Sequence, residues 1–188
     1  MSGYDSYLHY MHALLASRFL QQQEVAKAQL LLALQKDPYN WASWCLLAQT
    51  TLAGDVPAQV HALPAPLLRQ CYRILHGADS KDHLDEKYLQ HIEHLLGIVP
   101  TFGTATLYKA NAYYNGRDYV TAIDLYKAVA QREPYRLDFA DKYSNALFVL
   151  NTPANIADLC TLSHHLIQID RFRPEVCATI GTAPLIFF

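Results

Sequence analysis

The chain has 188 residues, of which 52% are hydrophobic and only 17% are charged, and its formal net charge is −2. A nearly neutral chain offers no basic stripe for phosphates, so the composition argues against a nucleic-acid-binding protein. This charged fraction is low for a soluble monomer, so we expect a partner protein to cover part of the apolar surface.

The first predicted helix has apolar or aromatic residues on nearly every side. We expect Tyr10, Ala13 and Leu14 to pack against the helix that follows, and one neighbour cannot cover the other large side chains. The end helix of a monomeric helical stack needs a polar outer face, which this helix lacks. The sequence therefore predicts a homodimer interface, whose residues are Tyr4, Tyr7, Leu8, Met11, Leu15, Phe19 and, near the rim, Trp41.

Residues 7–40 have the spacing of a tetratricopeptide repeat, a unit of about 34 residues that forms two antiparallel helices. Counted back from Pro38, which closes the unit, Tyr10 takes position 4, Ala26 position 20 and Ala33 position 27. Small residues belong where two helices cross closely, because a larger side chain there would push the helices apart. We therefore predict a repeat over 7–40, with these four residues in its packing.

Residues 41–99 are less regular. Trp41 to Leu52 reads as a helix that places Trp44 at position 4 of a second unit. The stretch from Gly54 to Pro66 holds three prolines and predicts a loop. Apolar residues then recur twice at helical spacing, so we predict two diverged helical pairs over 41–99.

Residues 103–136 match the repeat better, although Thr106 and Lys109 depart from the consensus. Between its two helices, Gly116 is predicted to take a left-handed position after the first helix, and Asp118 to cap the second. The residues expected in the packing of this repeat are Ala110, Tyr113, Ala122, Tyr126 and Pro134.

Two further segments continue the pattern. Thr152 and Pro153 read as the cap and first residue of a helix in a repeat over 137–173, and a further repeat begins over 174–188. No run alternates apolar and polar residues as a strand would. The sequence predicts an all-α fold, a single tetratricopeptide-repeat domain over 1–188 whose antiparallel helix pairs form a right-handed superhelix.

Cysteines and histidines indicate no chemistry. The cysteines fall on apolar helical positions far apart in sequence, which predicts reduced core thiols in an intracellular protein; they are Cys45, Cys71, Cys160 and Cys177. His9 with His12, and His91 with His94, are spaced to share a metal but lack a local third ligand. We expect surface or groove histidines, and no catalytic residue, metal or cofactor.

Two blocks of sequence go beyond a generic repeat. The block from Glu133 to Val149 and the stretch from Ile169 to Gly181 resemble the family of anaphase-promoting complex subunit eight (cell-division-cycle protein 23). That family shows D-P-Y-R, S-N-L-L-Y-V and I-D-K-Y-R-x-E-x-C series in the same order. Pro38 to Trp44 resembles its P-x-x-W-x-A-W segment. The resemblance runs from about residue 8 to 181 and is loosest over 54–100; the family continues with further repeats after Gly181, so we expect a fragment or an alternative end.

The resemblance implies a non-catalytic scaffold subunit of a ubiquitin ligase that controls mitosis, found in the nucleus and cytoplasm. Its amino-terminal repeats would form a two-fold homodimer and assemble with other subunits, without nucleic acid, membrane or a small-molecule substrate.

The alternative is a peptide-binding adaptor of the chaperone-tail type, which grips a terminal carboxylate with basic and amide side chains. Its candidate residues are Lys109, Asn111, Arg117, Lys142 and Asn145. Such a clamp repeats basic positions on successive first helices, and the segment from Tyr10 to Ser17 supplies none.

Overall fold

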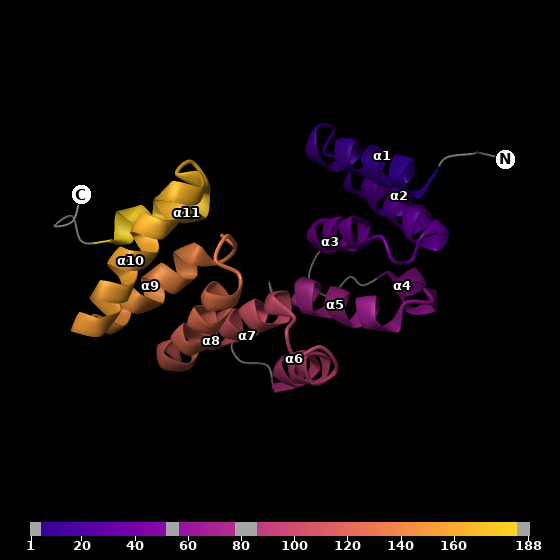
Figure 1. The fold of residues 1–188 in the computed structure, drawn as a ribbon. Helices are drawn as coiled ribbons and strands as arrows, with labels where there is room; N and C mark the ends of the chain where they lie inside the picture. Colours follow the sequence, from indigo (N-terminus) through magenta and orange to yellow (C-terminus); the bar gives the residue numbers. More distant parts are fainter. Residues whose placement is uncertain (1–4, 52–56, 78–85, 184–188) are drawn as a thin grey trace. The chain divides into compact units, whose positions relative to one another are not determined.

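The computed structural model describes residues 5–51, 57–77 and 86–183, and in these residues it has eleven α-helices and no strand (Figure 1). Consecutive helices pack against each other, which confirms the predicted all-α fold of helix pairs. The chain divides into two compact units, residues 1–81 and 82–188, and each is described by itself. One continuous domain over 1–188 stays a prediction.

The first unit contains α1 (Ser6–Arg18), α2 (Gln23–Lys36), α3 (Trp41–Thr50), α4 (Ala58–Ala62) and α5 (Pro66–Gly77). The second unit contains α6 (Glu86–Ile98), α7 (Gly103–Asn115), α8 (Tyr119–Arg132), α9 (Ala140–Leu150), α10 (Pro153–Asp170) and α11 (Pro174–Thr182).

The core of the first unit is built around Trp44. Its ring is fully buried, and its indole N–H donates a hydrogen bond to the carbonyl oxygen of Pro38 at 2.8 Å. The Tyr72 ring lies 5.7 Å away, and the Tyr72 hydroxyl shares a 3.1 Å hydrogen bond with Thr51 Oγ1. One aromatic side chain of α3 thus joins the turn that closes the first repeat to helix α5.

The predicted loop over 54–66 is wrong in part, because residues 58–62 form the short helix α4; residues 52–56 lie outside the described residues. Prolines stand before and after this helix but not inside it, so no backbone donor is lost within it. Val60 is 2% exposed and packs in the core cluster of the first unit. Burial of this one side chain explains why five residues between prolines become helical.

The core of the second unit lies where α7, α8 and α9 meet. Ala110 and Ala122 are fully buried at the α7–α8 contact, and the rings of Tyr126 and Tyr143 lie 5.6 Å apart. Burial raises the pKa of Tyr143 to about 12, with smaller contributions from Asp158 and Asp124. Both phenols therefore stay neutral and serve packing, since burial also raises the pKa of Tyr126.

The turn between α7 and α8 corrects one prediction. Asp118 caps α8 as expected, accepting from the Thr121 amide at 3.2 Å. The left-handed residue is Arg117 (φ 63°), whereas Gly116 has φ −75°. The left-handed residue that ends α7 is therefore one position later than predicted. The amides of Arg117 and Asp118 donate hydrogen bonds to the carbonyl oxygens of Tyr114 and Tyr113, which closes the end of the helix. A side chain in this region costs roughly 1–2 kcal/mol relative to glycine.

Each repeat is closed by a hydrogen bond between its last turn and the start of its first helix. Asn40 Nδ2 donates to Ser6 Oγ at 3.3 Å in the first unit. In the second unit, Arg136 donates to Thr104 Oγ1 at 2.8 Å, and Arg173 donates to an Asp138 carboxylate oxygen at 2.8 Å. The residue before each donor is an exposed aromatic, namely Tyr39, Tyr135 and Phe172.

Candidate partner-binding surface

Helix α1 turns its small and polar residues inward. Ala13 and Ala16 are fully buried, which lets α1 and α2 approach closely. Two side chains fix the rotation of the helix, because Ser6 Oγ donates to the carbonyl oxygen of Ala33 at 3.1 Å and His9 Nδ1 lies 2.7 Å from Gln29 Oε1. The buried face of α1 is therefore made of small and polar residues, and Tyr10 and Leu14 pack half-buried against the core beside it, as predicted.

The other large apolar side chains of α1 face outward. Tyr7 is 59% exposed, and Leu8, Met11 and Leu15 are each about half exposed. Phe19, just beyond the helix, is 75% exposed. Their spacing of four residues places Tyr7, Met11 and Leu15 in one row. These five residues define the outer apolar face of α1.

Charge does not interrupt this face. From residue 6 to residue 17 the sequence contains no Asp, Glu, Lys or Arg. Two copies of such a face could meet without bringing like charges together, and an isologous contact would bury the same patch twice. Trp41, predicted at the rim, is 37% exposed at the start of α3, and Tyr4 lies outside the described residues.

The residues predicted for repeat packing divide into three groups. The buried ones are Ala26, Ala33, Trp44, Ala110, Ala122 and Tyr126; the half-buried ones are Tyr10, Pro38 and Tyr113. Pro134 is exposed, so its ring takes no part in the buried packing. Its effect is on the chain direction, because the residue before a proline is disfavoured in a helix and α8 ends at Arg132.

The structure brings only part of the alternative clamp together. Lys142 donates to Asn111 Oδ1, and Asn145 donates to the Tyr114 hydroxyl, so amide side chains of α7 and α9 meet. Lys109 instead forms a 3.2 Å ion pair with Glu93 of α6. Arg117 lies in the turn after α7.

Histidines and cysteines lie apart from any common site. No group of three or more potential metal ligands occurs among the described side chains. His12, His91 and His94 are exposed as predicted, but His9 is buried because it faces α2. Within the described ranges, no helix has both the length and the apolar character needed to cross a membrane.

The cysteines follow the predicted core positions only in part, since Cys71 is buried whereas Cys45 and Cys160 are half-buried. Cys177 is exposed, because α11 buries Val176 and Thr179 instead. Burial raises the pKa of Cys45 to about 11, and the nearby Cys71 raises it by a smaller amount. Burial also raises the pKa of Cys71. Both thiols are therefore protonated at neutral pH and fit a packing role.

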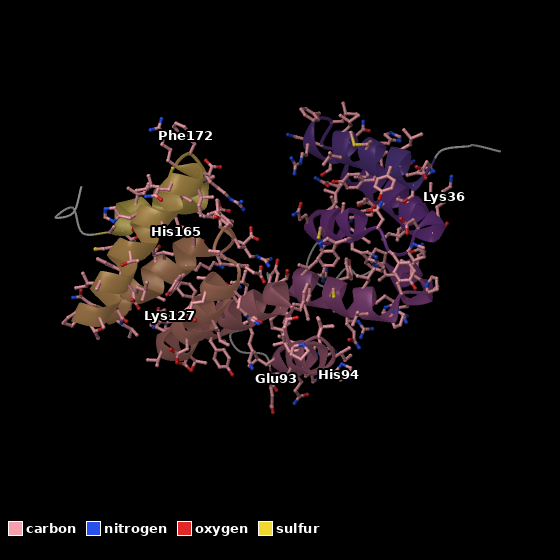
Figure 2. The ribbon with its side chains drawn as sticks, in the orientation of Figure 1. Lys36, Glu93, His94, Lys127, His165 and Phe172 are labelled. Carbon is pink, nitrogen blue, oxygen red and sulfur yellow. The ribbon has the colours of Figure 1, made fainter. Side chains whose placement is uncertain are left out.

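Sequence reasoning missed three of the four most exposed aromatic residues in the described part of the chain. Tyr135 and Phe172 are each 78% exposed, and Tyr39 is 72% exposed. Figure 2 shows Phe172 projecting outward at the turn before α11. Their position in the sequence could have identified them, because each directly precedes the residue whose side chain closes its repeat, namely Asn40, Arg136 or Arg173.

No known protein-family profile matches the chain. Curated proteins similar to it include the anaphase-promoting complex subunit CDC23 of Saccharomyces cerevisiae, 39% identical over 96 residues, which are 51% of this chain and 15% of the yeast protein. Anaphase-promoting complex subunit 8 of Arabidopsis thaliana is 24% identical over 163 residues, covering 85% of this chain and 26% of the relative. Anaphase-promoting complex subunit 8 of Dictyostelium discoideum is 25% identical over 179 residues, which are 94% of this chain and 29% of the relative.

These relatives confirm the resemblance to subunit eight of the anaphase-promoting complex. In each of the three, the matched part spans less than a third of the relative's own length.

Proposed function

We propose that this chain is a non-catalytic scaffold segment of an anaphase-promoting complex subunit, and that its first repeat mediates homodimerisation. The similar curated proteins are named as subunits of that complex, and this supports the same assembly for this chain. Its partners would be a second copy and other subunits of the complex, in the nucleus and cytoplasm.

The observation that carries the dimer is the outer apolar face of α1. A helix that buries alanines and exposes Leu8, Met11 and Leu15 reverses the usual arrangement of a surface helix. Single exposed apolar residues need no explanation, but a row of them without charges does. A stable two-fold contact should bury at least about 1,200 Å² in total.

The oligomeric state tests this proposal directly. Sedimentation equilibrium at several concentrations should give the dimer mass for the wild-type chain. The variant Leu8→Glu with Met11→Glu places unpaired carboxylates in the contact and should sediment as a monomer. The matched control is Phe148→Glu with Val149→Glu, two equally exposed residues of α9, which should leave the dimer intact. Wild-type protein that stays monomeric at tens of micromolar contradicts the proposal.

The peptide-binding adaptor has less support. A carboxylate clamp needs several cations converging on one groove, and Lys109 is held by Glu93 while Arg117 lies in a turn. The pairs Asn111–Lys142 and Asn145–Tyr114 are the part that remains.

A further inference from the structure

We propose that Arg136 and Arg173 form two electrostatic bridges that couple the repeats of the second unit, and that rising ionic strength weakens this coupling. Each bridge joins the starts of the first helices of two successive repeats, α7 to α9 and α9 to α11. The residues of the two arginine bridges are Thr104, Glu133, Arg136, Asp138, Arg173 and Glu175. All of them belong to the second unit, and the proposal does not rest on homodimerisation.

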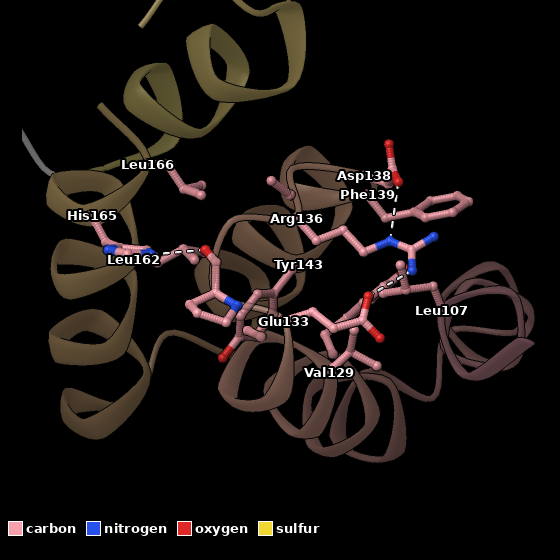
Figure 3. A pocket seen from close by; sticks show the side chains of 14 residues that line it. Leu107, Val129, Glu133, Arg136, Asp138, Phe139, Tyr143, Leu162, His165 and Leu166 are labelled. Carbon is pink, nitrogen blue, oxygen red and sulfur yellow. Dashed lines mark hydrogen bonds and ion pairs between the residues drawn. The ribbon is translucent and has the colours of Figure 1, made fainter. Parts of the chain in front are cut away.

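The first bridge joins α7 to α9 through Arg136. Its Nη2 donates to Oγ1 of Thr104, the second residue of α7, at 2.8 Å, and its Nε donates to Asp138 Oδ2, just before α9, at 3.1 Å. A third contact, from Nη1 to Glu133 Oε2 at 2.8 Å, ties the guanidinium to the end of α8. Figure 3 shows the guanidinium between the Asp138 and Glu133 carboxylates. The fixed fork of guanidinium donors suits several acceptors at once.

The second bridge repeats this arrangement one repeat further along the chain. Arg173 Nη2 donates to Asp138 Oδ1 at 2.8 Å, and Arg173 Nε donates to Glu175 Oε2 at 3.1 Å. Glu175 is the second residue of α11, so this bridge joins α9 to α11. Each carboxylate oxygen of Asp138 accepts from a different arginine. Asp138 is therefore the residue that the two bridges share.

The charges of the bridges alternate in sign, from Glu133 through Arg136, Asp138 and Arg173 to Glu175. A single exposed ion pair contributes little to stability, whereas a network of several charges contributes more. Without Asp138, both arginines would lose the carboxylate that neutralises them. The Arg136 and Asp138 side chains are 24% and 45% exposed, so dissolved ions reach the bridges and screen them.

The start of α7 leaves room for the first bridge. Gly103 is the first residue of α7, and a side chain there would collide with the Glu133 carboxylate. The glycine therefore lets this carboxylate lie against the N-terminus of the helix, where negative charge is favourable. In the first unit, the corresponding bond from Asn40 to Ser6 is uncharged. We thus expect the bridges to respond to ionic strength and the closing bond of the first unit not to respond.

The bridges act between neighbouring repeats. The stability of a stack of repeats depends on the contacts between nearest neighbours, so such contacts decide how far a local opening spreads. Arg136 and Arg173 lie in the two blocks of sequence that go beyond a generic repeat, Glu133 to Val149 and Ile169 to Gly181. Their role is to hold the starts of α7, α9 and α11 together, so that α10 and α11 do not open independently of α7 and α8.

Amide hydrogen exchange of the full chain tests this coupling. Asp138→Asn removes the shared charge but keeps the side-chain shape, and the amides of α10 and α11 should exchange at least about fivefold faster than in the wild type. The matched control is Asp158→Asn, which removes the comparably exposed Lys127–Asp158 ion pair between α8 and α10 and should speed the same exchange less than about twofold. The amides of α2, in the first unit, should not change in either variant.

Ionic strength and an arginine variant complete the test. Raising NaCl from about 0.05 M to about 0.5 M should speed the exchange of α10 and α11 more in the wild type than in Asp138→Asn, because screening acts on intact bridges. Arg173→Gln breaks the second bridge from its other side, and the double variant should exchange no faster than the faster single variant. Arg173→Gln also decides the question if Asp138→Asn fails to fold. Equal exchange in Asp138→Asn and Asp158→Asn, equal salt dependence of wild type and Asp138→Asn, or single-variant effects that multiply in the double variant would overturn the proposal.

Discussion

Helices α1 and α7 open the two repeats with the best-matched spacing, and each has 13 residues. Helix α7 buries seven residues and exposes no large hydrophobic side chain along its fully described length. Helix α1 buries four residues, all small or polar, and exposes Tyr7, Leu8, Met11 and Leu15. In the described residues, α7 packs against α6, α8 and α9, whereas α1 packs against α2 and α3.

The difference shows how one repeat pattern serves two purposes. In α7 the small residues Ala110 and Ala112 are buried, and the larger Leu107 and Tyr113 belong to the same core cluster as residues of α8 and α9. In α1 the small residues Ala13 and Ala16 are again buried, but of its large side chains only Tyr10 and Leu14 pack against the core. Large apolar side chains that are buried or half-buried along α7 thus have exposed counterparts along α1, namely Tyr7, Leu8, Met11 and Leu15.

The largest expected effect separates the two tryptophans of α3. Trp44→Ala removes a fully buried ring and should lower the free energy of unfolding by about 3–5 kcal/mol. Trp41→Ala should cost at most about half as much, because more than a third of this side chain stays in water. Chemical denaturation of both variants measures the difference. Equal losses would mean that Trp44 is not the centre of the core.

The second effect compares the two helices directly. Leu107→Ala in α7 deletes buried hydrocarbon and should cost about 2–4 kcal/mol. Leu15→Ala in α1 should change the stability of the monomer by less than about 0.5 kcal/mol, because half of this side chain is exposed. The measurement uses the Leu8→Glu, Met11→Glu background, so that dimerisation does not contribute. A large loss at Leu15 would place this residue in the core of its own unit.

A third effect checks where the helices of the second unit cross. Ala122 is fully buried between α7 and α8. Ala122→Leu should overpack this contact and lower the free energy of unfolding by about 1–3 kcal/mol. Ala128→Leu, on the exposed side of the same helix, should be nearly neutral. Thermal unfolding distinguishes the two, and equal tolerance would show that the repeat register is wrong.

The smallest effect concerns a feature that the two repeats share. Gln21 (φ 54°) and Arg117 (φ 63°) are left-handed residues in the turns after α1 and α7. Gln21→Gly and Arg117→Gly should each stabilise the chain by about 0.5–1 kcal/mol, since glycine adopts this conformation without steric cost. Gly116→Ala should be tolerated, because Gly116 has φ −75°. A destabilised Arg117→Gly would argue for a side-chain contact there.

Much of the helical framework could be read from local pattern. Asp118 and Thr152 accept hydrogen bonds at helix starts as predicted, because a cap depends only on the next three residues. The buried alanines at 26, 33, 110 and 122 also follow from spacing, since only small residues fit a close helix crossing. The α4 helix could not be read, because it depends on a distant contact of Val60.

The sequence by itself determined every helix except α4, how the helices of the repeats pair, and that α1 has apolar or aromatic residues on nearly every side. Only the tertiary structure decided which face of α1 turns inward. A helix with apolar residues on nearly every side has no pattern that fixes its rotation, so the outcome depends on fit: Ala13 and Ala16 allow the close approach, and Ser6 and His9 find partners on α2. The arginine bridges are likewise tertiary, because Arg136 reaches Thr104 and Arg173 reaches Asp138 only when the chain folds.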